Sequence, residues 1–256
     1  MLQAARIELA TIQLSTNRQQ EARRTAEEVV RHYAQRQLPG HTNAIAAQSV
    51  LAQAWLTLHL FELNPDPRQW RDAARRLWET REQLRRSHGP LNAQTLTTDV
   101  EYGFALLCLG QPTPAQVHLT TTLENLRRRF PAGHPVIMRA TLLLGRTHAQ
   151  LQEYERSREL HQDAYVGLRS TLGPRHPETL AAQYGLGVAL KLTGADGLGQ
   201  QMIWQVARTA PSVVGVKTDL FGQSLVGTLI LPILPGRVWR RISRLGSPAP
   251  RRDDTT

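Results

Sequence analysis

The sequence predicts an all-α fold, a right-handed solenoid of about five antiparallel helix pairs. Three observations lead to this prediction. Ala, Leu, Gln, Glu and Arg dominate the chain while aromatic residues make up only 5%, a composition that favours helices over strands. A short motif recurs at an offset of 42 residues, and small residues recur in the same register. At 256 residues the chain can bury a sizeable core without covalent staples.

The recurring motif marks helix starts. Its best copies are Phe130-Pro-Ala-Gly-His-Pro-Val-Ile-Met138 and Leu172-Gly-Pro-Arg-His-Pro-Glu-Thr-Leu180, and a weaker copy, His88-Gly-Pro-Leu-Asn-Ala-Gln-Thr-Leu96, lies one offset earlier. In the two best copies a proline follows a polar residue and precedes an apolar run. Proline suits the first turn of a helix because its missing N–H would have no partner there. Each copy therefore predicts a new helix.

Small residues recur where neighbouring helices must touch. They stand in the first helix of each pair at Ala10, Ala52, Gly103, Gly145 and Gly187, and in the second helix at Ala22, Ala73, Ala115, Ser157 and Gly199. The first set is spaced by 42, 51, 42 and 42 residues. The nine extra residues of the second interval fall around Asn64-Pro-Asp-Pro67, a turn-forming segment in which an insertion lengthens a loop without disturbing either helix.

This register places every helix in order. First helices are predicted near residues 2–16, 43–62, 94–109, 136–151 and 178–193, and second helices near 18–36, 68–86, 112–130, 153–171 and 195–208. Each amphipathic pair buries its remaining face only against the next pair, which is why the pairs stack into a solenoid.

The motif and its spacing resemble the 42-residue tetratricopeptide repeats of the kinesin light chain type, marked by Leu-Gly-x-x-His-Pro-x-Thr-Leu before the first helix. Residues 172–180 match this pattern in full, and the resemblance covers about residues 1–209. It implies a scaffold that binds a protein or peptide. In bacteria such arrays often follow nucleotide-binding regulatory domains. This chain has no Gly-x-x-x-x-Gly-Lys-Ser/Thr phosphate loop, so no ATPase activity is inferred.

The chain departs from this family at one functional position. First helices of the family usually carry an Asn that faces the groove and holds peptide backbone or carboxylate. In this chain that position holds Glu8, Val50, Glu101, Leu143 and Gly185. The amide clamp is therefore not carried over.

First helices line the concave surface of a helix-pair solenoid, so the register also predicts which residues face a partner. The candidate contacts are Gln53, Thr57, Thr97, Glu101, Phe104, Arg139, Arg146, Gln150, Val188 and Lys191. Arg139 and Arg146 lie two turns apart on one helix, where they are candidates to hold a carboxylate or phosphate through charge-assisted hydrogen bonds. The competing interpretation is an ordinary solvated polar face.

The charge balance does not identify the partner more specifically. Basic residues outnumber acidic ones 31 to 21, for a formal net charge of +10, yet Lys occurs only at Lys191 and Lys217. Such an Arg bias is typical of a high-GC coding sequence. No zinc-finger, helix-turn-helix or aromatic-rich sheet motif accompanies it, so nucleic acid is the least favoured partner. The single cysteine, Cys108, excludes a disulfide framework, and no metal or cofactor is predicted.

No catalytic constellation is found. His134 and His176 stand at equivalent helix starts one repeat apart, which predicts helix caps or turn packing for both. His-Glu-x-x-His, Gly-x-Ser-x-Gly and paired-carboxylate arrangements are absent from the sequence. The chain is therefore predicted not to be an enzyme.

After about residue 210 the composition changes to an apolar stretch followed by a basic amphipathic one. Two interpretations compete: a helix over about 217–231 that caps the open end of the solenoid, or a segment over 220–245 that lies in an anionic membrane surface. Candidate membrane contacts are Phe221, Leu225, Leu229, Arg237, Trp239, Arg240, Arg241 and Arg244.

The sequence thus predicts a repeat domain at 1–209, a helical segment at 210–245 and a disordered tail at 246–256. The hypothesis for function is a cytoplasmic bacterial adaptor that binds a protein or peptide on its concave face. The alternative is a peripheral membrane scaffold that uses residues 220–245.

Overall fold

The computed structural model describes residues 2–16, 18–38, 41–60 and 67–214, which form ten helices and no strand. The helices are α1 (Leu2–Ser15), α2 (Gln19–Gln35), α3 (Thr42–Leu60), α4 (Pro67–His88), α5 (Ala93–Cys108), α6 (Pro112–Arg129), α7 (Pro135–Gln150), α8 (Tyr154–Leu172), α9 (Pro177–Leu192) and α10 (Asp196–Val214). All five predicted pairs are present. The last helix runs six residues past its predicted end, through Pro211.

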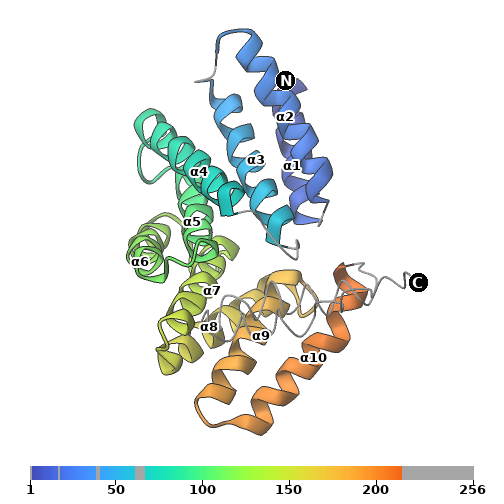
Figure 1. Ribbon diagram of the computed structural model, residues 1–256, viewed down its shortest axis with the longest axis vertical. Coiled ribbons are helices and arrows are strands. Elements are labelled where there is room, and N and C mark those ends of the chain that lie inside the picture. Colours follow the sequence, from blue (N-terminus) through green and yellow to red (C-terminus); the bar gives the residue numbers. More distant parts are fainter. Residues whose placement is uncertain (1, 17, 39–40, 61–66, 215–256) are drawn as a thin grey trace, which may run out of the picture.

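The helices follow one another around an open, C-shaped curve (Figure 1). Each packs against its neighbours in the chain, and the odd-numbered helices also contact one another in the series α1, α3, α5, α7 and α9. These first helices of the pairs therefore form an inner layer. Of the second helices, α4 and α6 lie visibly on the outside of the curve (Figure 1).

Helix starts repeat as the motif predicts. Asn92, His134 and His176 are spaced by 42 residues, and each caps the helix that follows. The Asn92 side chain accepts from the N–H of Gln94 at 2.9 Å, whereas His134 and His176 use Nδ1 to accept the corresponding N–H groups at 3.3 and 3.2 Å. Each bond satisfies one of the orphan donors of a first turn. The interpretation of the two histidines as caps is confirmed.

The turn between the helices of a pair also repeats. Its left-handed residue is Gly110, Gln152 and Gly194 in three successive pairs, with φ values of +68°, +66° and +92°. Glycine adopts this conformation without the Cβ clash that opposes it in other residues. Gln152 therefore holds a strained position that its two equivalents fill with glycine.

Small residues on the inner helices receive large side chains from the outer ones. A Cβ added at Gly103 would lie 2.4 Å from the Leu119 side chain, and one at Gly145 would lie 2.9 Å from the ring of His161. The prediction that small residues mark close helix approach is confirmed at these positions.

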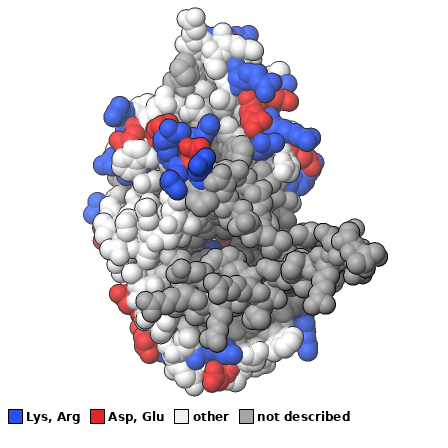
Figure 2. Space-filling view, viewed as in Figure 1, with Lys and Arg blue, Asp and Glu red and all other residues white. Residues whose placement is uncertain are grey.

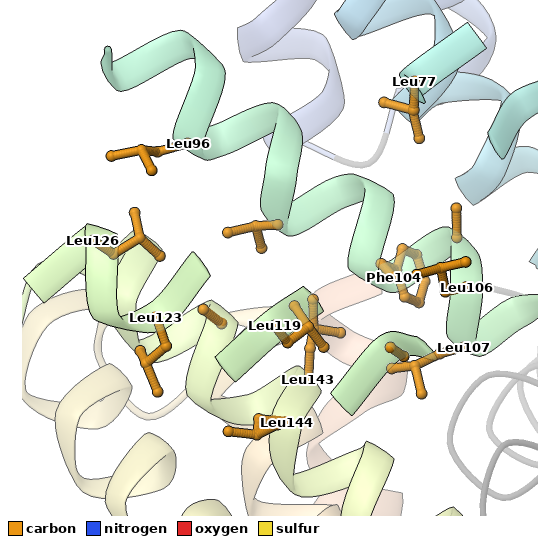
Figure 3. Close-up of a cluster of buried hydrophobic side chains, with 14 of the residues drawn as sticks. Leu77, Leu96, Phe104, Leu106, Leu107, Leu119, Leu123, Leu126, Leu143 and Leu144 are labelled. Atoms are coloured by element: carbon orange, nitrogen blue, oxygen red, sulfur yellow. The ribbon is translucent and has the colours of Figure 1, made fainter. Parts of the chain in front are cut away.

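The largest apolar cluster spans the middle of the array. It extends from Ala73 in α4 to Leu160 in α8, and its centre includes Leu119, Leu126 and Leu143 (Figure 3). Smaller clusters join α1, α2 and α3 around Ala26 and Val29. The core therefore runs along the array as a seam between inner and outer helices.

Two predictions fall outside the described residues. The segment 215–256, with its predicted cap, membrane contacts and tail, is not described, and neither are residues 61–66 of the predicted insertion. Within the residues that are described, no helix is long and apolar enough to cross a membrane.

Candidate functional site

The predicted partner contacts lie on the inner helices α3, α5, α7 and α9. Gln53 and Thr57 belong to α3, and their side chains are not among those described. Thr97 on α5 is exposed, and its hydroxyl donates to the carbonyl of Ala93 at 2.9 Å. Phe104, in contrast, is only 6% exposed and belongs to the central apolar cluster.

Arg139 ties three inner helices together. From α7 its Nε and Nη2 donate to the two carboxylate oxygens of Glu101 on α5, at 2.9 and 3.0 Å. Its Nη1 donates to Glu178 in the first turn of α9. Burial lowers the pKa of Arg139, but the two carboxylates raise it by more, so the guanidinium stays charged. The planar fork of arginine suits this bidentate geometry.

Glu101 is the buried member of this network. Its side chain is 7% exposed, against 29% for Arg139 and 22% for Glu178. A carboxylate so deeply buried requires a paired charge, and the bidentate bond to Arg139 provides it. Glu101 therefore serves the packing between α5 and α7, with both of its oxygens occupied.

Arg146 lies two turns after Arg139 on the same face of α7 and is only 9% exposed. Burial lowers its pKa to about 10, the charge of Arg139 acts in the same direction, and the charge of Glu178 opposes them. Among the described residues no side chain forms a hydrogen bond or ion pair with Arg146. The residue as a whole is thus largely buried, but none of its nitrogens is among the buried atoms that lack a hydrogen-bond partner.

The remaining candidates extend the same face. Gln150 and Val188 are partly buried, and Lys191 is exposed near the end of α9. The Lys191 ammonium donates to Gln200 on α10 at 2.8 Å.

Sequence reasoning missed Glu178 and His161. Counting one repeat of 42 residues onward from Arg139, Glu178 lies three residues short of that position. Counting one repeat onward from Glu101, Arg139 lies four residues short. Charges offset by one helical turn per repeat are the signal that could have revealed the network. His161 stands one repeat after Leu119 and is fully buried. Its position could have been predicted to be buried, because leucine occupies the equivalent position in the two preceding repeats.

A second polar cluster joins outer and inner helices and is internally satisfied. Asp99 on α5 is paired with Arg81 on α4, and His118 on α6 bonds the Asp99 carbonyl at 2.8 Å. Tyr102 packs edge-on against His118. Among the described residues, no group of His, Cys, Asp and Glu side chains is arranged to hold a metal ion.

Comparisons with known proteins find a similar repeat and a similar fold. The family model named tetratricopeptide repeat matches residues 137–196, which include most of α7, all of α8 and α9, and the network residues Arg139 and Glu178. The kinesin light chain TPR-like repeats of P. anserina match with a TM-score of 0.57 and 21% identity, over 83% of this chain and 96% of that one. Residues 137–196 thus match a tetratricopeptide repeat, and the chain shares the fold of this array of kinesin light chain-like repeats.

Two further solved structures share the tetratricopeptide fold. BtubC (BKLC) from P. vanneervenii has a TM-score of 0.56 and 15% identity, and the match covers all of this chain and 98% of that one. A Rap protein complexed with Competence and Sporulation Factor has a TM-score of 0.55 and 9% identity, over 93% of this chain and 64% of that one. At such identities the likeness establishes the fold. The search of curated protein sequences finds no match.

Proposed function

We propose that this chain is a non-enzymatic cytoplasmic adaptor that binds a protein or peptide along the inner helix layer of its array. The observation that carries the proposal is the polar network that joins three successive inner helices. Arg139 on α7 pairs with Glu101 on α5 and with Glu178 on α9. Solenoids of helix pairs use such extended concave surfaces for binding.

The fold supports a protein or peptide as the ligand. The Rap structure, which shares the helical architecture, is a complex with Competence and Sporulation Factor. The charges visible on the face shown in Figure 2 do not favour nucleic acid. On the face shown in Figure 2, the visible Lys and Arg patches are interrupted by Asp and Glu, whereas binding to a phosphate backbone needs a continuous basic patch.

The binding face can be tested with a peptide library and two photo-crosslinker positions. The full chain is incubated with random synthetic peptides of about twelve residues, roughly 40 Å when extended, and retained peptides are identified by mass spectrometry. A benzophenone amino acid then replaces Thr97 on inner helix α5 or Thr121 on outer helix α6. The pair is matched, because both are exposed threonines whose hydroxyls donate to the carbonyl four residues earlier.

We expect retained peptides to crosslink to the Thr97 position and not to the Thr121 position. Equal crosslinking at the two positions would move the binding surface away from the inner layer. Failure of the wild-type chain to retain any peptide would contradict peptide binding itself.

A further inference from the structure

Exposed arginines gather at the ends of two outer helices. The last turns of α4 and α6 together hold five of them, which we call the basic edge: Arg85, Arg86, Arg127, Arg128 and Arg129. Two of these residues, Arg127 and Arg128, stand one repeat of 42 residues after the first two, so the groups share one register. Within the described part of the chain, none of the five forms an ion pair.

The two groups of arginines lie next to each other on one edge of the array. Helices α5 and α7 pack against each other, and their caps, Asn92 and His134, directly follow the two loops that the arginines precede. The bond between Glu101 and Arg139 relates the two starts, since Glu101 lies nine residues after its cap and Arg139 five. At about 1.5 Å per residue the starts differ by only about 6 Å. The α4–α5 and α6–α7 loops are therefore neighbours.

Helix termination alone does not require this charge. A cation in the last turn stabilises a helix through its macrodipole, yet α5 and α10 end without a basic residue there, and α8 ends with Arg169 alone. The inner helices α7 and α9 end on the opposite edge with one basic residue each, His148 and Lys191. The excess of positive charge thus belongs to one edge of the array.

The loops that follow the arginines have exposed apolar tips. Leu91 in the α4–α5 loop is 42% exposed, and Pro131 and Ala132 in the α6–α7 loop are exposed as well. A single exposed leucine is ordinary on a protein surface. Apolar tips beside a group of cations, however, suit an anionic lipid surface, where the tips enter the headgroup boundary and the cations meet phosphates. A nucleic-acid backbone offers the arginines similar charge but offers the tips no apolar region.

We propose that the basic edge binds an anionic lipid membrane surface, with the Leu91 loop entering the headgroup region. Arginine suits this contact because its planar fork bonds two phosphate oxygens at once. The contact lies on the repeat domain and is distinct from the candidate membrane segment 220–245. It also lies at the ends of the outer helices, apart from the inner-layer network of Glu101, Arg139 and Glu178. The inference therefore goes beyond the proposed function and does not depend on it.

The test is co-sedimentation of the full chain with vesicles of phosphatidylcholine alone or of phosphatidylcholine and phosphatidylglycerol in equal parts, at increasing salt. The edge variant is Arg127→Gln with Arg128→Gln. The control variant is Arg24→Gln with Arg71→Gln, because both residues are exposed in the first halves of outer helices α2 and α4 and their loss changes the net charge equally. A third variant, Leu91→Gln, tests the apolar tip.

We expect the wild type to bind vesicles that contain phosphatidylglycerol, and to bind them less as salt screens the charges. The edge variant should bind about tenfold or more weakly, since each cation near an anionic surface contributes roughly fivefold, and the control variant should bind as the wild type does. Leu91→Gln should weaken binding without changing its salt dependence. Thermal unfolding midpoints should stay unchanged, because the substituted side chains are exposed.

The inference is overturned if the wild type does not bind phosphatidylglycerol vesicles, or if the edge and control variants bind them equally well. Equal binding would mean that net charge or another segment, such as 220–245, makes the contact. A labelled DNA duplex is assayed with the same proteins by fluorescence anisotropy. Binding to DNA that requires Arg127 and Arg128, without binding to vesicles, would assign the basic edge to nucleic acid. Vesicle binding by a chain that retains no peptide would contradict the proposed function and support this inference.

Discussion

His161 shows how one residue changes the behaviour of a repeated position. Leucine occupies this position in the two preceding repeats, at Leu77 and Leu119. Nδ1 of His161 donates to the carbonyl of Ser157 at 2.8 Å, and its Nε2 is buried without a partner. The larger ring fits because Gly185 stands where the preceding repeat has Leu143; a Cβ at Gly185 would lie 2.3 Å from the ring. Burial lowers the pKa of His161 to about 4.

This lowered pKa makes stability depend on pH. At pH values between this pKa of about 4 and the ordinary histidine pKa of about 6.5, the unfolded chain binds a proton that the folded chain excludes. Stability therefore rises with pH through this window and falls on acidification, by up to about 3 kcal/mol from this group. We expect His161→Leu, which restores the residue of the preceding repeats, to lose this part of the dependence.

The measurement is urea unfolding of wild type and His161→Leu at several pH values from 7 to 4, with the exposed His88 replaced by leucine as a control. The stability difference between His161→Leu and wild type should grow as the pH falls, and His88→Leu should follow wild type. If the free energy of unfolding changed with pH in the same way for all three proteins, His161 would not titrate as a buried group.

At the scale of the helices, close approach is set by paired small residues. The last pair shows it most directly, since Gly187 on α9 and Gly199 on α10 leave no space for a side chain. A Cβ at Gly199 would lie 2.5 Å from the Gly187 carbonyl oxygen and 3.0 Å from the backbone nitrogen of Lys191. Backbone atoms cannot move aside without displacing a whole helix, so this contact fixes how α10 docks on α9.

Two glycine substitutions in α10 test this contact. Gly199→Ala should destabilise the chain by about 1–3 kcal/mol, the usual cost of overpacking. Gly197→Ala is the matched control, because a Cβ there meets nothing within 4 Å, and alanine in a helix is favoured over glycine by up to about 1 kcal/mol. Chemical unfolding measures both. Equal effects of the two substitutions would mean that α10 packs less closely on α9.

At the scale of the whole molecule, the core is uneven along the array. The main cluster joins α4 to α8, whereas α1 and α2 contribute to two small clusters with α3. Leu2, Leu9 and Ile12 on α1 remain 66%, 47% and 57% exposed. A solenoid is stabilised mainly by contacts between neighbouring units, so its local stability follows the local core.

Native-state hydrogen exchange should therefore show a gradient. The backbone amides of α5, α6 and α7 should exchange only through the unfolding event with the highest free energy. Those of α1 and α2 should exchange through a local unfolding event with a lower free energy. Exchange measured by mass spectrometry at increasing urea concentrations resolves the two. A single opening free energy for all these helices would show that the array unfolds as one unit.

The sequence alone determined the helix pairs, their caps and their close contacts. These features repeat at a spacing of 42 residues, apart from the nine extra residues of the second interval, and local chemistry fixes each of them. The caps at His134 and His176 each bond an N–H two residues away. Gly103 leaves space for the side chain of Leu119, sixteen residues away in the same pair. Repetition makes such signals readable, because each copy checks the others.

Only the tertiary structure decided what the inner face presents. Glu101, Arg139 and Glu178 come from three different pairs, and their meeting depends on the stagger of one inner helix against the next, which the packing of the whole array sets. The same packing left Arg146 only 9% exposed, and burial lowers its pKa to about 10. A sequence register shows which residues share a face, but the pairing of charges between helices requires their positions in space.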